Sequence, residues 1–264
     1  MAPDLLKKSL RTLSKAFNRM NILSFDVSGN YSSISLLNND EVNTFTQTHD
    51  RKDRPDWDKL FSSIGFDSKD DFDELDALAF ACGPGSYTAL RITASFLKAI
   101  AEVKKLPLIP ISSLESIALE ASHWIDEAEA RIFVAIEADT KESYFCSYQK
   151  NNQKLNPISD EGVMQMTELL ELLKKDDCYF AGTGWPKAEV INPKFLGEVN
   201  GSAEPIAILA KSRLETEEMA SHLRSPAGGT PSAKEPRRSS STGSHPPPPP
   251  CWAKDWKQKK WRDH

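Results

Sequence analysis

Short apolar runs separated by turn-forming tripeptides open the folded part of the chain. Residues Ile22 to Val27 form a mostly apolar run, Ser28-Gly29-Asn30 supplies turn residues, and Tyr31 to Leu37 reads as a second strand. A third strand, Glu41 to Gln47, follows another turn-rich tripeptide at Asn38 to Asp40. This pattern predicts a three-stranded antiparallel start.

The next segment changes from a strand pattern to helical spacing and back. Asp56 to Ile64 predicts a short helix, and Leu75 to Ala81 is continuous enough for a strand buried on both faces. Gly83-Pro84-Gly85 ends that strand sharply. Ser86 is the expected N-cap of a helix that runs to about Lys105.

The pattern then repeats in coarser form. Leu108 to Ile111 predicts a strand, and a helix follows through Ala121, with Glu115 expected to form a capping box with Ser112. Later strands and helices are predicted at Ile132 to Ile136, Tyr144 to Tyr148, from Lys154, Met166 to Leu173, Cys178 to Ala181 and Ile206 to Met219. Two sets of strands followed by helices predict two similar α/β lobes.

Both ends of the chain differ in composition from the middle. Residues 1–19 form a basic extension, and the natural domain start at Met20 suggests an over-long gene start. Residues 221–264 are rich in Pro, Ser and basic residues, a composition that predicts disorder. We therefore expect an N-terminal lobe at 20–122, a C-terminal lobe at 123–220, and two flanking tails.

Charge and cysteine usage narrow the function classes. The net charge of −5 divides into +4 for residues 1–19, +6 for residues 223–264 and −15 for the rest. An acidic body is a poor stand-alone RNA binder, because Lys and Arg contacts to phosphate dominate that affinity. Four isolated cysteines predict free thiols in a reducing cytoplasm, and no apolar run is long enough to span a membrane.

Two turns carry the candidate chemistry. Asp26 and Ser28 stand where a carboxylate could hold Mg²⁺ beside a nucleotide phosphate, although an Asx turn explains them equally well. Gly83, Pro84, Gly85 and Ser86 deliver the chain into a helix whose free N–H groups would attract an anion. The second turn lacks the lysine of a Walker loop and does not fit GxGxxG.

The segment Cys82 to Thr93, CGPGSYTALRIT, resembles the GPGSFTGLRIG signature of the TsaB (YeaZ) family. The opening MNILSFDVSGNYSSISLL is similar to that family's first hairpin, and Val134 to Tyr144 resembles its VAIDAR..EVY segment. Asp139 and Lys141 depart from this second pattern, where the family has Arg and Gly. The likeness extends from Met20 to Met219.

This resemblance implies an actin-like, two-lobed fold and a role as the non-catalytic partner of TsaD in forming N6-threonylcarbamoyladenosine at position 37 of ANN-decoding tRNAs. TsaE and tRNA would join through the complex, and a homodimer is an alternative assembly. The helices at Trp57 to Ile64 and Ser86 to Lys104 would form the partner face. The residues assigned to it are Trp57, Phe61, Tyr87, Arg91, Phe96 and Leu97.

A degenerate actin-like enzyme with weak ATP or ADP binding and ATPase activity is the alternative. Against catalysis, the five histidines are far apart in sequence, so no paired-histidine metal motif is present. The second-lobe turn Glu137 to Thr140 has no glycine for backbone approach to phosphate. GPGSYT is also not a GxSxG nucleophile elbow. We therefore expect no catalytic residues, no metal, no required cofactor and no membrane association.

Overall fold

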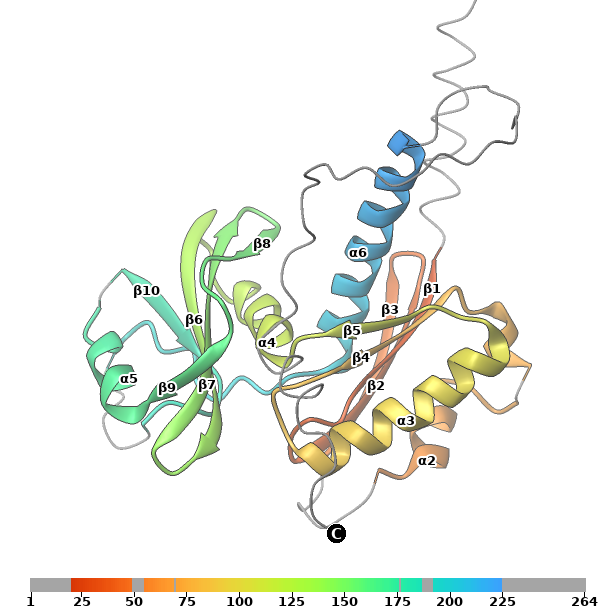
Figure 1. The fold of residues 1–264 in the computed structure, drawn as a ribbon, viewed down its shortest axis with the longest axis horizontal. Helices are drawn as coiled ribbons and strands as arrows, with labels where there is room; N and C mark the ends of the chain where they lie inside the picture. The colour runs from red at the N-terminus through yellow and green to blue at the C-terminus, as the bar shows by residue number, and fades with distance from the viewer. Residues whose placement is uncertain (1–19, 49–54, 69, 176, 187–191, 225–264) are drawn as a thin grey trace, which may run out of the picture.

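The structure is a computed structural model that describes residues 20–48, 55–68, 70–175, 177–186 and 192–224, with side chains described to residue 216. Two sheets lie side by side, each flanked by helices (Figure 1). The predicted basic extension at 1–19, His49 and residues 225–264 of the predicted tail lie outside the described residues.

The first sheet has five strands in the order β3-β2-β1-β4-β5. The first three strands are antiparallel, as the sequence pattern predicted, and β4 and β5 continue the sheet in parallel from β1. The strands are β1 (Asn21–Asp26), β2 (Tyr31–Asn38), β3 (Glu41–Thr48), β4 (Ala77–Ala81) and β5 (Leu108–Ile111).

The two faces of β4 carry side chains of different size and are covered by different helices. Leu78 and Phe80 face α2 (Trp57–Ser63) and α3 (Tyr87–Lys104), where they join one buried cluster. The alanines at alternate positions, Ala77, Ala79 and Ala81, pack against α6 (Ala203–Arg224). Period-two alternation thus puts large residues on one face and small residues on the other, where a helix can approach closely.

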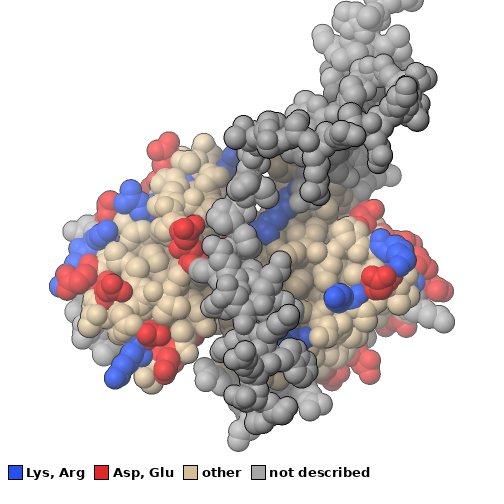
Figure 2. All heavy atoms as spheres, in the orientation of Figure 1, with Lys and Arg blue, Asp and Glu red and all other residues tan. Residues whose placement is uncertain are grey.

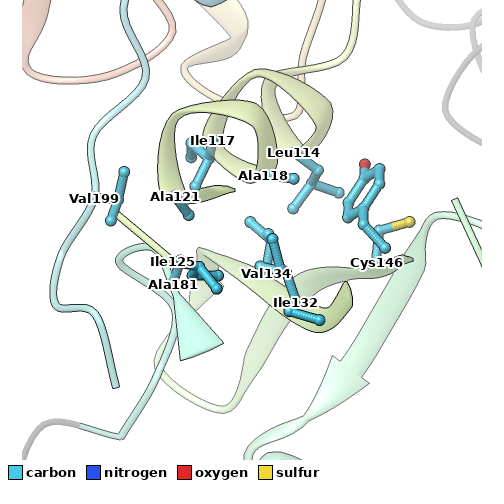
Figure 3. Packing of buried hydrophobic residues seen from close by; sticks show 12 residues of the cluster. Leu114, Ile117, Ala118, Ala121, Ile125, Ile132, Val134, Cys146, Ala181 and Val199 are labelled. Atoms are coloured by element: carbon cyan, nitrogen blue, oxygen red, sulfur yellow. The ribbon is translucent and has the colours of Figure 1, made fainter. Parts of the chain in front are cut away.

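The second sheet has the order β10-β6-β7-β8, with β9 also paired to β7. Its strands are β6 (Glu129–Asp139), β7 (Glu142–Asn151), β8 (Lys154–Pro157), β9 (Gly162–Gln165) and β10 (Cys178–Ala181). α4 (Ser113–Ser122) covers one face and α5 (Met166–Leu172) the other. Figure 3 shows the first of these contacts, where Leu114, Ile117 and Ala121 of α4 meet Ile132 and Val134 of β6.

The lobe boundary at residues 122 and 123 stays a prediction. Two helices pack on the sheet that lies on the other side of this boundary in the sequence. The strands of the two sheets fall on either side of it, but α4 packs on the second sheet and α6 returns to the first (Figure 1). Arg213 of α6 donates to Glu115 of α4 and to the Pro110 carbonyl. Glu115 therefore pairs with Arg213 where the two helices meet. The sequence had predicted that Glu115 would form a capping box with Ser112.

Candidate functional site

The carboxylate of Asp26 lies fully buried at the end of β1. Its Oδ1 accepts from the Ser28 backbone N–H at 2.9 Å and from the Ser28 hydroxyl at 2.6 Å. Its Oδ2 accepts from the Tyr31 hydroxyl at 2.9 Å. The Asx-turn interpretation therefore describes this site well, and Tyr31 is a partner that turn chemistry alone did not indicate.

The Gly83-Pro84-Gly85 turn packs directly on the first hairpin turn. The Ser86 backbone N–H donates to the Ser28 carbonyl at 2.8 Å, and a Cβ on Gly85 would lie 2.6 Å from that same oxygen. Gly83 has φ of +114°, which favours glycine. Ser86 does occupy the N-cap position of α3, but its side chain makes no capping hydrogen bond, so its backbone contact is what fixes the start of the helix.

Burial controls the protonation of this cluster. Removal from water raises the pKa of Asp26 above its ordinary value of 3.8, although the hydrogen bonds from Ser28 and Tyr31 oppose the shift. Burial, and then the neighbouring Asp26 charge, raises the pKa of Tyr31 well above its ordinary value. Tyr31 is therefore a hydrogen-bond donor to Asp26 at neutral pH.

Asp26→Asn is expected to gain stability relative to the wild type as the pH rises through and above 3.8. The raised pKa of Asp26 means that the folded state binds its proton more tightly than the unfolded state does. Protonated Asp26 therefore contributes to the stability of the wild type, and this contribution is fully present below pH 3.8 and is lost as the pH rises through the pKa of the folded state. Urea unfolding of both proteins across this range measures the effect. Parallel stability curves for the two proteins would contradict it.

The predicted partner face lies on α2 and α3, and its exposed residues, Tyr87 and Arg91, lie on α3. Tyr87 is 71% exposed, Ile92 39% and Val103 77%, so three large apolar side chains are in contact with solvent along one helix. The Arg91 guanidinium donates to the Tyr87 hydroxyl at 3.1 Å and lies 5.2 Å from its ring centroid. We call these exposed residues, Tyr87, Arg91, Ile92 and Val103, the α3 face; with 3.6 residues per turn, Tyr87 and Arg91 lie on one flank of the exposed side and Ile92 and Val103 on the other.

Half-buried aromatic rings of α2 and α3 lie between the core and solvent. Trp57 and Phe96 pack with their ring centroids 4.5 Å apart, and Phe61 lies 6.1 Å from Phe96. Leu97, also predicted at the interface, is fully buried in the core of the first lobe and so belongs to internal packing. The predicted set thus divides into exposed, half-buried and core residues.

Sequence reasoning missed two residues of the carboxylate cluster. Tyr31 was assigned to a strand without a role, and Gly201 was not singled out. A Cβ on Gly201 would lie 2.6 Å from the Tyr31 hydroxyl and closer still to Asp26 Oδ2, so Gly201 packs directly on both groups. No sequence signal places Gly201 near Asp26, because the two are brought together by the return of the chain into α6.

Among the described residues, no group of three or more His, Cys, Asp or Glu side chains is arranged to hold a metal ion. Within the same part of the chain, no helix is long and apolar enough to cross a membrane. On the face shown in Figure 2, acidic and basic side chains are intermixed at the edges of both lobes. Cys82, Cys146 and Cys178 are free, as predicted, and Cys251 lies outside the described residues.

Comparison with known proteins decides the family. The family described as TsaD, tRNA N6-adenosine threonylcarbamoyltransferase, matches residues 46–234, which is more than half of the chain. The tRNA threonylcarbamoyladenosine biosynthesis protein TsaB of Haemophilus influenzae is 30% identical over 178 residues, which are 63% of this chain and 73% of that protein. The chain belongs to the TsaB branch of this family. TsaB of Escherichia coli is 27% identical, over 63% of this chain and 72% of its own length.

Solved TsaB relatives share the fold. YeaZ from Pseudomonas aeruginosa superposes with a TM-score of 0.61 at 23% identity, covering 75% of this chain and 95% of that one. A second structure, described as an uncharacterized protein with similarity to peptidase YeaZ from the same organism, gives 0.62 at the same identity, covering 75% of this chain and 94% of its own. The α/β fold of these two structures is thereby confirmed for this TsaB family member, and family membership gives it a role in tRNA threonylcarbamoyladenosine biosynthesis.

Proposed function

We propose that this chain is a non-catalytic partner of TsaD, acting by complex formation while TsaD makes N6-threonylcarbamoyladenosine at position 37 of ANN-decoding tRNAs. The observation that carries the proposal is the α3 face, which exposes Tyr87, Ile92 and Val103 on one helix. Large apolar side chains that are exposed on one helix favour association, because a partner that covers them removes their surface from water. Arg and Tyr are also enriched at the centres of interfaces.

The half-buried aromatic rings support a packed interface beside this face. The rings of Trp57 and Phe96 pack together between α2 and α3 and remain partly exposed to solvent. A partner helix that covers the α3 face would also remove these rings from water, and apolar burial of this kind contributes about 25 cal/mol per Å². The proposed interface therefore includes Trp57, Phe61, Tyr87, Arg91 and Phe96, without Leu97.

The absence of a catalytic role is part of the proposal. The two turns that suggested phosphate chemistry pack against each other through the Ser86 N–H and the Ser28 carbonyl. The acidic character of residues 20–222 favours delivery of tRNA by the complex over direct binding by this chain. We infer a cytoplasmic protein that contacts TsaD directly and TsaE and tRNA through the complex, with no required cofactor. A homodimer is the competing assembly.

Mixing the full chain with TsaD of the same organism tests the proposal. Size-exclusion chromatography with light scattering should give a stoichiometric complex, and the mixture should form threonylcarbamoyladenosine on tRNA faster than TsaD with its other factors alone. The matched control is the full chain without TsaD, which should form no modified nucleoside. A protein that ignores TsaD and hydrolyses ATP by itself would instead favour the degenerate ATPase.

A further inference from the structure

The end of β1 is where an actin-like protein would hold a metal–nucleotide, and Asp26 is the residue that would do so here. A carboxylate that ligates Mg²⁺, directly or through water, needs oxygen lone pairs that face water or phosphate. In this chain the two oxygens of Asp26 accept three hydrogen bonds from the protein, two from Ser28 and one from Tyr31. The carboxylate is also fully buried.

The space around Asp26 is filled by backbone from three segments. The Tyr31 ring lies against Gly29, where a Cβ would be 3.0 Å from the ring atom Cδ1, and the Tyr31 hydroxyl lies against Gly201. Gly85 packs on Ser28 from the third side. Each contact is close enough that a methyl group would need atoms to move, so a phosphate group does not fit between these segments.

The Tyr31 hydroxyl connects these segments. It packs against Gly201 and donates to Asp26 Oδ2, while Asp26 Oδ1 accepts from the Ser28 backbone N–H and hydroxyl. Two residues after Gly201, the Ala203 N–H donates to the Ser33 hydroxyl at 3.0 Å, and the Ser24 hydroxyl donates to the Ala203 carbonyl at 2.6 Å. The start of α6 is therefore fixed to β1 and β2 on the α6 side of the sheet.

We propose that Tyr31 closes the metal–nucleotide position at Asp26 and converts this carboxylate into a structural joint between the first hairpin and the segment that leads into α6. The joint does not depend on the proposed partnership with TsaD, because it concerns contacts within one chain. It also distinguishes between this proposal and the degenerate ATPase at one residue, because an ATPase would need Asp26 free to hold the metal–nucleotide.

The first arm of the test uses wild-type protein and the probe Mg²⁺ with ATP at millimolar concentration. A ligand that binds the folded state alone raises the melting temperature. We expect no change in melting temperature and no heat of binding. A rise that Asp26→Asn abolishes would overturn the proposal.

The second arm measures the coupling between the two side chains. Tyr31→Phe removes one donor from a buried carboxylate and should lower the melting temperature by roughly 3 to 12 °C. In the Asp26→Asn background the same change should cost less, because no buried charge loses its donor. Tyr144→Phe, the same substitution at a half-buried position of β7, should shift the melting temperature by less than Tyr31→Phe does. Additive effects of the two substitutions would overturn the joint, and if Tyr31→Phe fails to fold, the first arm still decides.

Discussion

Ile92→Asp is expected to weaken the complex with TsaD by roughly 30- to 1,000-fold in Kd, the range typical of residues at the centre of an interface. Ile92 is 39% exposed on the α3 face, between Tyr87 and Val103 along the helix. A carboxylate there would lose its hydration on binding without gaining a partner, which is costly. Because the side chain already contacts solvent, the free protein should remain folded.

The matched control is Val163→Asp on β9. Val163 is 56% exposed, so the two substitutions introduce the same charge at exposed apolar positions, but β9 belongs to the second sheet. Titration of TsaD with each variant by calorimetry, together with a melting curve of each free variant, separates binding from folding. Equal affinities for the two variants would remove the α3 face from the interface. Self-association of the free chain, tested with the same pair by light scattering, decides whether this face also forms the homodimer.

Leu97→Ala is expected to lower the free energy of unfolding by about 2 to 5 kcal/mol, the cost of removing a large aliphatic side chain from a packed core. Leu97 is fully buried among residues of α2, α3 and the first sheet. Urea unfolding measures the loss. Lys98→Ala at the neighbouring exposed position should change the same quantity by less than about 0.5 kcal/mol.

The Leu97→Ala variant distinguishes a role of Leu97 in core packing from a role in binding TsaD. If Leu97 acts through the core, the folded fraction of Leu97→Ala should bind TsaD with wild-type affinity. A loss of affinity at unchanged stability would return Leu97 to the interface, where the sequence placed it.

Local pattern was sufficient for much of the fold. The short helix predicted at Asp56 to Ile64 is α2, and Asp56 caps it by accepting from the Lys59 N–H at 3.1 Å. Ser112 caps α4 through the N–H groups of Leu114 and Glu115. Such features depend on residues a few positions apart, so they can be read directly from the chain.

Helix partners were less predictable. The sequence predicted two lobes each with its own helices, but α4 and α6 pack across that division. An apolar stripe shows that a helix buries one face and does not show which sheet receives it. The three alanines of β4, spaced two apart, make room for α6. This role depends on the tertiary contact between the helix and the strand.

The sequence by itself determined the strand–turn–helix order, the acidic body, the Gly-Pro-Gly turn and the family resemblance, because each depends on composition or on neighbours along the chain. Tertiary structure decided that Leu97 faces inward while Tyr87 and Val103 face solvent, since helical spacing alone does not distinguish a core face from an interface. It also decided the state of Asp26, because Tyr31 meets that carboxylate when β1 and β2 pair, and Gly201 meets it only after the chain has crossed to the second sheet and returned. Burial and long-range hydrogen bonds are properties of the packed molecule. They are the reason why we assign Asp26 to a contact between the first hairpin and the segment before α6 and not to a phosphate site.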